Sequence, residues 1–307
     1  MVRGVCALVA AACACALAAP DNASYTFCHW LRRGEGARRL YAASVRTAGW
    51  GAVCAVQDAR RVPACSGAVL APRWALTAAH CVAGAHYVHY NSEHAQAGGA
   101  AAAVAARYQH PHYRVTVRVV AGVPEVRALQ HDVGLLQAAA DMTLATVPHP
   151  PPLDAINMFP PDLLINSKLE VLGFGRWEGG QAGEELRAAS LTAVSCGRAA
   201  WRACVCGAGA GGVCAGDSGG PALRGGALVA LSSLGPVYCA RASSDGRAPA
   251  SVLTALQPYA ELLLATVQGD ASRPRLRRLQ LSPRRAGAAA APLPSLPLLL
   301  LAAGLRR

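Results

Sequence analysis

Short apolar runs, separated by glycine, proline, asparagine and aspartate, make up most of the chain from residue 40 to about residue 268. The clearest runs are Val53–Val56, Ala68–Leu70, Val115–Val120, Val133–Leu136, Leu169–Leu172 and Ala227–Leu231. Runs of this length are typical of strands, because an amphipathic helix needs a longer segment with apolar residues every three or four positions. The pattern predicts an all-β protein, a barrel or a sandwich.

Two segments depart from this pattern. Apolar residues recur at helical spacing across Val252–Val267, and Pro258 places the start of that helix at or after itself because proline disrupts a helix interior. Ala100–Ala106 is alanine-rich and open to a helical interpretation, although its short length and glycine neighbours weigh against one.

The N-terminal end has the pattern of a secretory signal peptide over residues 1–18. Arg3 precedes an apolar stretch that ends in the small-x-small sequence Ala16-Leu17-Ala18. A buried N-terminal helix is the alternative. Export would make Asn22, in the sequon Asn22-Ala23-Ser24, a glycosylation site. We therefore predict a secreted glycoprotein.

The remaining chain divides by composition into three parts. Residues 19–39 are rich in arginine and resemble a cleavable propeptide, residues 40–268 form the folded domain, and residues 269–307 form an Arg-rich, low-complexity tail with an apolar end. That end permits three interpretations: a lipid-anchor signal, a short membrane span weakened by prolines, or a disordered tail. Membrane attachment through the C-terminus, on the outer cell surface, is thus one prediction.

The net charge of +12 comes mainly from the flanks. Residues 40–268 hold 16 basic and 14 acidic side chains, a net of +2, whereas the 269–307 tail has eight arginines and one aspartate. A basic binding face on the domain is therefore not indicated, and we expect no nucleic-acid partner.

The 12 cysteines fit an oxidising compartment. Removal of residues 1–18 discards three of them and leaves nine. Because nine is odd, at least one stays a thiol or pairs with another chain.

Three motifs carry candidate chemistry: Leu76-Thr77-Ala78-Ala79-His80-Cys81, then Asp132-Val133-Gly134-Leu135-Leu136, then Gly216-Asp217-Ser218-Gly219-Gly220-Pro221. A serine hydroxyl becomes a nucleophile when an imidazole takes its proton and a carboxylate orients that imidazole. Each motif alone is equally consistent with a core histidine, a turn aspartate or a tight loop. In this order and spacing they predict His80, Asp132 and Ser218 as a catalytic triad.

Two other serine-hydrolase arrangements fail on residue order. Gly216–Gly220 matches the G-x-S-x-G pattern of α/β-hydrolases, which needs a histidine after the serine, but the last of the nine histidines is His149. The subtilisin order needs an aspartate before the histidine. Asp21 and Asp58 precede His80, and neither lies in a matching motif.

On these motifs, residues 40–268 resemble the trypsin/chymotrypsin family of serine proteases. The resemblance implies two six-stranded antiparallel β-barrels with the active site between them and a C-terminal helix. It implies that His80 is the general base, that Asp132 orients it, and that Ser218 forms an acyl-enzyme. The amides of Gly216 and Ser218 match the oxyanion hole, and Ser233-Leu234-Gly235 matches the strand that pairs with substrate backbone, with Leu234 in place of the usual tryptophan.

The resemblance also implies three disulfides: Cys65 with Cys81, Cys214 with Cys239, and Cys196 with Cys204, where Cys206 competes for the last role. Another usual bridge lacks both partners, since Leu169 and Arg224 stand in their places. Cys28, Cys54 and Cys206 receive no partner.

Specificity and activation are implied by position within the family. Gly212, followed by Val213, lies at the base of the specificity pocket, where trypsin-like members have an aspartate. Gly235 keeps one wall open, and Ala250 or Ser251 occupies the other. The pocket therefore suits mid-sized apolar side chains, because an unpaired substrate cation would be costly to bury.

For activation, Arg39 is the expected cleavage site, which frees Leu40 to pair with Asp217. Leu40-Tyr41 is an unusual start compared with the family's Ile-Val-Gly-Gly.

No metal or cofactor is expected: His86, His89 and His94 cluster in one segment, but without thiolates or placed carboxylates they indicate a surface loop. The predicted function is a secreted serine endopeptidase, with protein or peptide substrates, protein inhibitors and an activating protease as partners. A catalytically silent homologue that acts as a binding or regulatory protein, and an esterase using the same residues, are the alternatives.

Overall fold

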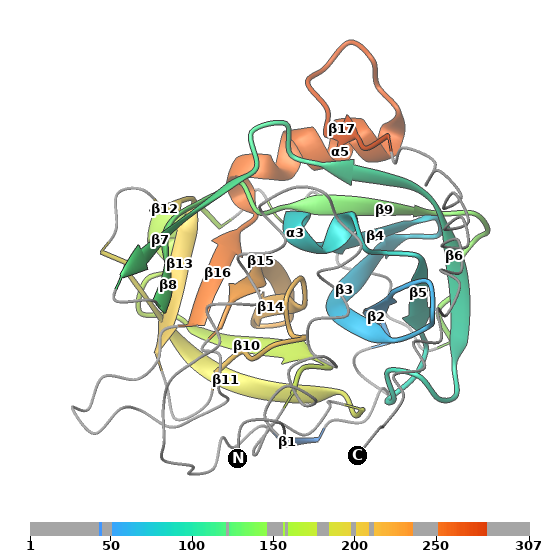
Figure 1. The fold of residues 1–307 in the computed structure, drawn as a ribbon, viewed down its shortest axis with the longest axis horizontal. Helices are drawn as coiled ribbons and strands as arrows, with labels where there is room; N and C mark the ends of the chain where they lie inside the picture. Colours follow the sequence, from blue (N-terminus) through green and yellow to red (C-terminus); the bar gives the residue numbers. More distant parts are fainter. Residues whose placement is uncertain are drawn as a thin grey trace, which may run out of the picture.

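The computed structural model describes residues 43–44, 51–120, 123–145, 156, 159–176, 184–197, 201–208, 212–235 and 251–280. The expected signal peptide, Asn22, the activation site Arg39-Leu40 and the apolar C-terminal end lie outside these residues. Two β-barrels lie side by side, one built from the first half of the chain and one from the second (Figure 1).

The first barrel is a closed sheet of six antiparallel strands. In sheet order these are β6 (Ala100–Gln109), β5 (Tyr87–Tyr90), β2 (Val53–Gln57), β3 (Pro63–Ala71), β4 (Trp74–Thr77) and β9 (Gly134–Ala138). Pairing of β9 back onto β6 closes the barrel. The short helix α3 (Ala79–Val82) follows β4.

The second barrel has the same construction. Its strands, in order, are β11 (Arg187–Val194), β10 (Lys168–Gly173), β14 (Pro221–Arg224), β15 (Ala227–Leu234), β16 (Ser251–Ala255) and β13 (Cys204–Ala208). Pairing of β13 onto β11 closes it, and β1 (Ala43–Ser44) adds to β11 from outside. A single turn of helix, α4 (Pro161–Leu164), precedes β10. The expected two-barrel fold is confirmed.

A smaller sheet joins the two barrels. Strands β7 (Arg114–Val120) and β8 (Val123–Gln130), which come between β6 and β9 in the sequence, pair with each other as antiparallel neighbours. β8 also pairs in parallel with β12 (Trp201–Arg202), which belongs to the second half of the chain.

The apolar runs predicted as strands lie in strands or at their starts. Val115–Val120 forms most of a strand in a separate small sheet, whereas the other five runs contribute buried side chains to the barrels. The helical interpretation of Ala100–Ala106 is wrong, since β6 covers this run. Pairing with β5 on one side and β9 on the other overrides the helix propensity of alanine. Ala102 and Ala106 point inward, with 7% and 4% of their surface exposed.

The C-terminal helix is shorter than the Val252–Val267 segment suggested. β16 takes the first part of that segment, then a 3-10 turn (Gln257–Tyr259) contains Pro258, and α5 (Ala260–Gln268) follows. The helix therefore begins after Pro258, as predicted. The residues before Pro258 form a strand because β16 pairs with neighbouring strands of the second barrel. Within the described residues, no helix is both long and apolar enough to cross a membrane.

The folded chain extends beyond Gln268, where we expected the low-complexity tail to begin. Leu276 is 4% exposed in the same core cluster as Leu263, and its amide donates to Thr266 Oγ1 at 2.9 Å. β17 (Arg277–Arg278) then pairs with β6. Residues 269–278 thus lie on the first barrel, next to α5 (Figure 1).

One apolar cluster spans both barrels and fixes their relative position. It includes Leu76 of β4, Leu172 of β10 and Leu231 of β15, each no more than 1% exposed, together with Tyr259 and Leu263. Burial of this shared core places the ends of strands from both barrels beside one another, where the candidate site lies.

Candidate active site

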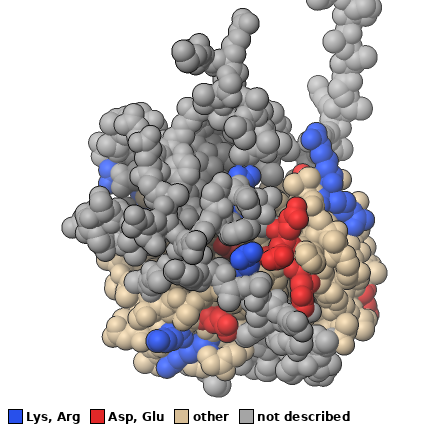
Figure 2. All heavy atoms as spheres, turned by 90° about the horizontal axis from the view of Figure 1, so that it is seen from below, with Lys and Arg blue, Asp and Glu red and all other residues tan. Residues whose placement is uncertain are grey.

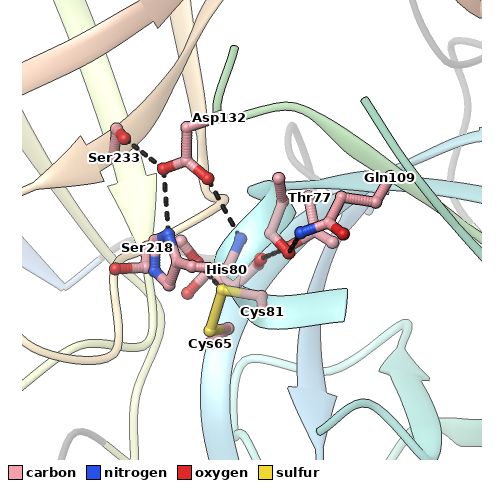
Figure 3. Close-up of polar contacts among 10 residues, drawn as sticks. Cys65, Thr77, His80, Cys81, Gln109, Asp132, Ser218 and Ser233 are labelled. Carbon is pink, nitrogen blue, oxygen red and sulfur yellow. Dashed lines mark hydrogen bonds and ion pairs between the residues drawn. A yellow bond between two sulfur atoms is a disulfide. The ribbon is translucent and has the colours of Figure 1, made fainter. Parts of the chain in front are cut away.

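His80, Asp132 and Ser218, far apart in sequence, come together between the barrels (Figure 3). His80 lies on α3, directly after β4, and Asp132 lies between β8 and β9. Ser218 lies in the turn that leads into β14 of the second barrel. The structure therefore assembles all three predicted residues in one place.

The His80–Asp132 pair is held by two contacts. His80 Nδ1 lies 2.9 Å from Asp132 Oδ2, and the His80 amide donates to Asp132 Oδ1 at 3.0 Å. Asp132 is fully buried. Burial by itself raises the pKa of this carboxyl, but the charge and hydrogen bonds of His80 and the Ser233 hydroxyl lower that pKa overall. Asp132 is thus an anion that fixes the orientation and tautomer of the His80 ring.

Ser233 has a role that sequence reasoning missed. We predicted it as part of a substrate-binding strand, but its hydroxyl donates to Asp132 Oδ2, from the second barrel to the first (Figure 3). A serine in a strand gives no signal of such a contact in a single sequence.

The turn containing Ser218 requires its glycines. Gly216 and Gly219 have φ angles of +99° and +82°, a region that favours glycine. A Cβ on Gly219 would also lie 2.1 Å from Thr77 Oγ1. Within the described part of the chain, the amides of Gly216 and Ser218 donate to no protein acceptor. Two N–H groups near one serine can together receive a developing negative charge.

Asp217 is half-buried, and backbone donors hold its carboxylate. Its Oδ1 accepts from the Gly175 amide at 2.7 Å and its Oδ2 from the Cys214 amide at 2.8 Å. A Cβ on Gly173 or Gly175 would lie within 2.4 Å of this carboxylate, so both glycines make room for it. Burial raises the pKa of Asp217 to about 6, although the two amide bonds oppose the rise. Among the described residues no cation forms an ion pair with it.

The predicted pocket residues lie beside the Ser218 turn. Val213 is 2% exposed, and its amide donates to Ser251 Oγ at 3.0 Å. Gly235 lies against Val213, since a Cβ on Gly235 would be 2.0 Å from the Val213 carbonyl oxygen. Gly212 is half-buried at the start of this turn. Ser251, one of the two residues considered for the pocket wall, is fully buried, and Ala250 lies outside the described residues.

The family assignment rests on the whole domain. The family model described as Trypsin matches residues 42–261. The chain belongs to the trypsin family. A curated relative, serine protease SP24D of Anopheles gambiae, is 31% identical over 198 residues, which cover 61% of this chain and 68% of that protein.

Solved structures of other proteins share the fold. Mouse neuropsin, a serine protease expressed in the limbic system of the brain, superposes with a TM-score of 0.58 at 22% identity, over 72% of this chain and 96% of that one. Human heparin binding protein superposes with a TM-score of 0.56 at 18% identity, over 76% and 97%.

Two disulfides are formed between described cysteines of this trypsin-family chain. Cys65 on β3 bonds to Cys81, directly after His80, and ties α3 to the barrel. Cys196 bonds to Cys206, so the expected pairing with Cys204 is wrong. Cys196 lies beyond the end of β11, which pairs Val194 with Cys206 and so brings that side chain within reach. Cys204, two residues earlier, stays a thiol.

Two further cysteines, Cys214 and Cys54, lie within the described residues. Cys214 is disulfide-bonded, and its expected partner Cys239 lies outside the described residues. Cys54 is a fully buried thiol.

The histidine segment from His86 to His94, predicted as a surface loop, is partly a buried strand. His89 belongs to β5 and is 5% exposed, with Nε2 2.7 Å from the Gly98 carbonyl oxygen, so the segment from His86 to His94 is not one surface loop. Cys65, Cys81 and the His80 ring nitrogen lie within 4.8 Å of one another. The two sulfurs are bonded to each other, so they are not thiolate ligands.

Surface charge on one face of the molecule is mixed. Figure 2 shows acidic side chains grouped beside separate basic ones on the face seen from below. The described residues of this face therefore present no continuous basic surface.

Proposed function

We propose that this protein is a secreted serine endopeptidase that cleaves peptide bonds after mid-sized apolar residues. The observation that carries the proposal is the buried, anionic Asp132 bound to His80, beside a serine in a turn whose two amides donate to no acceptor among the described residues. A domain that only binds proteins has no need for this combination.

In the proposed mechanism, Ser218 is the nucleophile, His80 transfers the protons, and two backbone amides stabilise the oxyanion. His80 Nε2 takes the Ser218 hydroxyl proton as Ser218 Oγ attacks the substrate carbonyl carbon. The amides of Gly216 and Ser218 stabilise the oxyanion, and removing one such donor typically costs roughly 3–4 kcal/mol of transition-state stabilisation. His80 then protonates the leaving amine, the C–N bond breaks, and water hydrolyses the acyl-enzyme by the same path.

The proposed specificity follows from the uncharged residues around the pocket. Gly212 and Val213 carry no acid, and the Ser251 hydroxyl accepts from the Val213 amide. We therefore expect Ala, Val, Leu or Met before the scissile bond rather than Arg or Lys, since nothing among these residues would pair a buried cation.

The proposed activation is cleavage after Arg39. β1 pairs Ala43 and Ser44 with Ala188 and Arg187, and Arg187 pairs in turn with Gly173, next to Asp217. A new chain start at Leu40, three residues before Ala43, could reach roughly 10 Å along this edge. Its ammonium group would then pair with the half-buried Asp217 carboxylate.

The test is labelling by an active-site-directed fluorophosphonate after processing. Wild-type protein should be labelled and Ser218→Ala should not, and a peptide library should report cleavage after apolar residues. Equal labelling of both proteins would reject Ser218. If neither protein reacts although N-terminal sequencing shows a free Leu40, the silent homologue is favoured. Cleavage of esters but not of peptides would favour an esterase.

The proposed location is the outside of the cell, with attachment through the apolar end at residues 288–305. Phosphatidylinositol-specific phospholipase should release the enzyme from expressing cells if that end is a lipid-anchor signal. Soluble protein in the medium with Leu301 still present would exclude an anchor.

A further inference from the structure

The chain continues past α5 as a folded segment, residues 269–279, which we call the arm. The arm lies beyond the stretch 42–261 that the family model matches. Leu276 anchors it in the core shared by both barrels, and β17 pairs with β6 beside α5 (Figure 1). The Leu279 amide then donates to a backbone carbonyl of β6 at 2.9 Å. The arm is therefore fixed against the first barrel along its length.

A cavity of about 670 Å³ lies between the arm, the end of α5 and the first barrel. The barrel contributes Trp74 of β4, Tyr108 of β6 and Gln137 of β9 to its lining. The arm contributes three arginines, Arg273, Arg275 and Arg278. No carboxylate is among the described residues that line the cavity, and none of the triad residues is either. Its volume lies within the range of small-molecule sites, roughly 300–1,000 Å³.

The barrel side of this cavity presents hydrogen-bond donors that lack an acceptor. Trp74 is 8% exposed, and its indole N–H donates to no acceptor among the described residues. A buried tryptophan usually has a partner for that N–H. The Tyr108 hydroxyl donates to Gln137 Oε1 at 3.4 Å, which leaves the Gln137 NH₂ group available. Two side-chain donors thus have room for acceptors from a ligand.

The three arginines of the arm differ in how far the protein already uses them. Arg273 forms ion pairs with Glu261 at 3.3 Å and with Asp270 at 3.4 Å. Arg275 donates to a backbone carbonyl at 3.4 Å. Arg278 is exposed and has no ion pair or hydrogen bond from its side chain within the described part of the chain. Arg278 is therefore the guanidinium that can make new paired bonds to an anion.

The register of β17 decides which of two neighbouring arginines faces the cavity. Arg278 pairs with Tyr108, and directly paired residues point to the same face of a sheet. Arg277 pairs with Gln109, whose side chain donates to the Ala79 carbonyl at the start of α3. Because neighbours along a strand alternate, Arg277 points away from the cavity and is not part of its lining.

These groups define the chemistry of a ligand. Donors without acceptors require ligand oxygens, and arginines favour a negative charge on some of them. Val267 and Leu276 add apolar side chains to the lining, so the ligand also presents C–H groups. Because so little of Trp74 is exposed, its ring offers no open face on which a flat nucleotide base could stack. A sugar that carries an anionic ester combines C–H groups, several oxygen acceptors and the charge.

We propose that the cavity between the arm and the first barrel is a binding site for a sugar bearing a sulfate or phosphate ester. The ester oxygens accept from Arg278 and Arg275. The ring and hydroxyl oxygens accept from the Trp74 indole N–H and the Gln137 amide. This assignment does not involve Ser218, so it stands apart from the proposed protease activity.

The test is isothermal titration calorimetry on the full chain carrying Ser218→Ala, which prevents self-cleavage. The probes are glucose 6-sulfate, glucose 6-phosphate, unesterified glucose and inorganic sulfate. We expect at least one ester to bind about 10-fold or more tightly than glucose, the usual worth of a hydrogen bond to a charged group, and more tightly than inorganic sulfate. Comparison of the two esters then identifies the preferred anion.

Three variants locate the binding. Arg278→Gln should weaken binding of the preferred ester by about 10-fold or more. Arg277→Gln is the matched control, because it removes the same charge from the neighbouring exposed residue, and it should change the Kd less than about 2-fold, since salt screens exposed charges that do not touch the ligand. Trp74→Phe keeps an aromatic ring but removes the N–H, and should weaken binding by about 5-fold. An unchanged Tm for each variant shows that the fold is intact.

Several outcomes would overturn the proposal. Equal losses in Arg277→Gln and Arg278→Gln would show that surface charge alone attracts the anion. Inorganic sulfate that binds as tightly as the esters would show an oxyanion site without sugar recognition. Absence of heat with both esters would leave the cavity without this ligand, and binding of phosphatidylserine vesicles by that same protein would assign the arm to a membrane surface instead.

Discussion

The Ser233 hydroxyl donates a hydrogen bond to Asp132 Oδ2, the same oxygen that lies 2.9 Å from His80 Nδ1. Ser233 comes from β15 of the second barrel, whereas His80 and Asp132 come from the first. The carboxylate is therefore oriented from both sides of the cleft. The relative position of the barrels, set by their shared core, is thus linked to the geometry of the proposed catalytic pair.

Replacing Ser233 with alanine should lower kcat/KM by roughly 10- to 100-fold, the usual worth of a hydrogen bond to a charged group. The bond lowers the pKa of Asp132, so this contribution to stability is present above the carboxyl's unfolded pKa, near 4, and is lost as pH falls below it. Chemical denaturation of both proteins at pH 7 and pH 3 should show a larger difference at pH 7.

Ser232→Ala is the control for that experiment. Ser232 is also fully buried on β15, and its hydroxyl has no hydrogen-bond partner among the described residues. Its removal should leave activity and stability almost unchanged. Similar losses in both variants would show that Ser233 acts through packing rather than through Asp132.

Gly235→Ala should reduce activity by about 10-fold or more and lower Tm, because a Cβ there would meet the Val213 carbonyl oxygen at 2.0 Å. The clash would push the strand away from the pocket base. Gly84→Ala, where a Cβ would meet nothing within 4 Å, is the matched control. A fully active Gly235→Ala enzyme with unchanged Tm would mean that this wall of the pocket is not built as described.

Sequence reasoning predicted the fold and the triad for different reasons. Runs such as Val53–Val56 are too short for helices and apolar enough for strands of a packed β-protein, so local pattern was sufficient for the all-β class. The two-barrel arrangement was implied by the resemblance to the trypsin/chymotrypsin family. The triad followed from motif order. Ala100–Ala106 failed because its strand state depends on two neighbours, β5 and β9, that a local pattern does not contain.

The remaining differences also come from long-range contacts. Ser233 reaches Asp132 from 101 residues away in sequence. Cys206 rather than Cys204 meets Cys196, because the register of β13 places Cys206 opposite Val194, next to Cys196 in the sequence. Leu276 completes a core in a segment whose composition indicates only a charged tail. None of these contacts leaves a periodic or compositional signal.

The pH dependence of the unprocessed chain should report on Asp217. Burial raises its pKa to about 6, above the unfolded value near 4. The folded state therefore binds more protons between these values, and stability should fall as pH rises from about 4 to about 6, by up to about 3 kcal/mol. Denaturation of the unprocessed Ser218→Ala chain across this range measures it, and processing at Leu40 should remove the effect by pairing the carboxylate.

Asp217→Asn isolates that contribution, because it removes the titrating group. The difference in stability between wild type and Asp217→Asn must be taken at each pH, because His110 has the opposite effect on the pH dependence of stability. Desolvation, followed by the charges of His131 and His112, lowers the pKa of His110 to about 4. A neutral buried imidazole makes stability rise with pH between about 4 and 6.5. If wild type and Asp217→Asn have the same pH profile of stability before processing, the pKa of Asp217 is not raised in the unprocessed chain.

The Cys196–Cys206 disulfide should survive Cys204→Ser and be lost in Cys206→Ser, as judged by peptide mapping without reduction. The bond closes a loop of 10 residues, which typically stabilises a domain by about 3 kcal/mol, so Cys206→Ser should lower Tm clearly. Cys204 should resist alkylation in the native state, because burial, with a smaller effect of Asp132, raises the pKa of its thiol to about 12. A Cys196–Cys204 peptide in wild-type protein, or rapid alkylation of Cys204, would instead show that β13 lies in a different register.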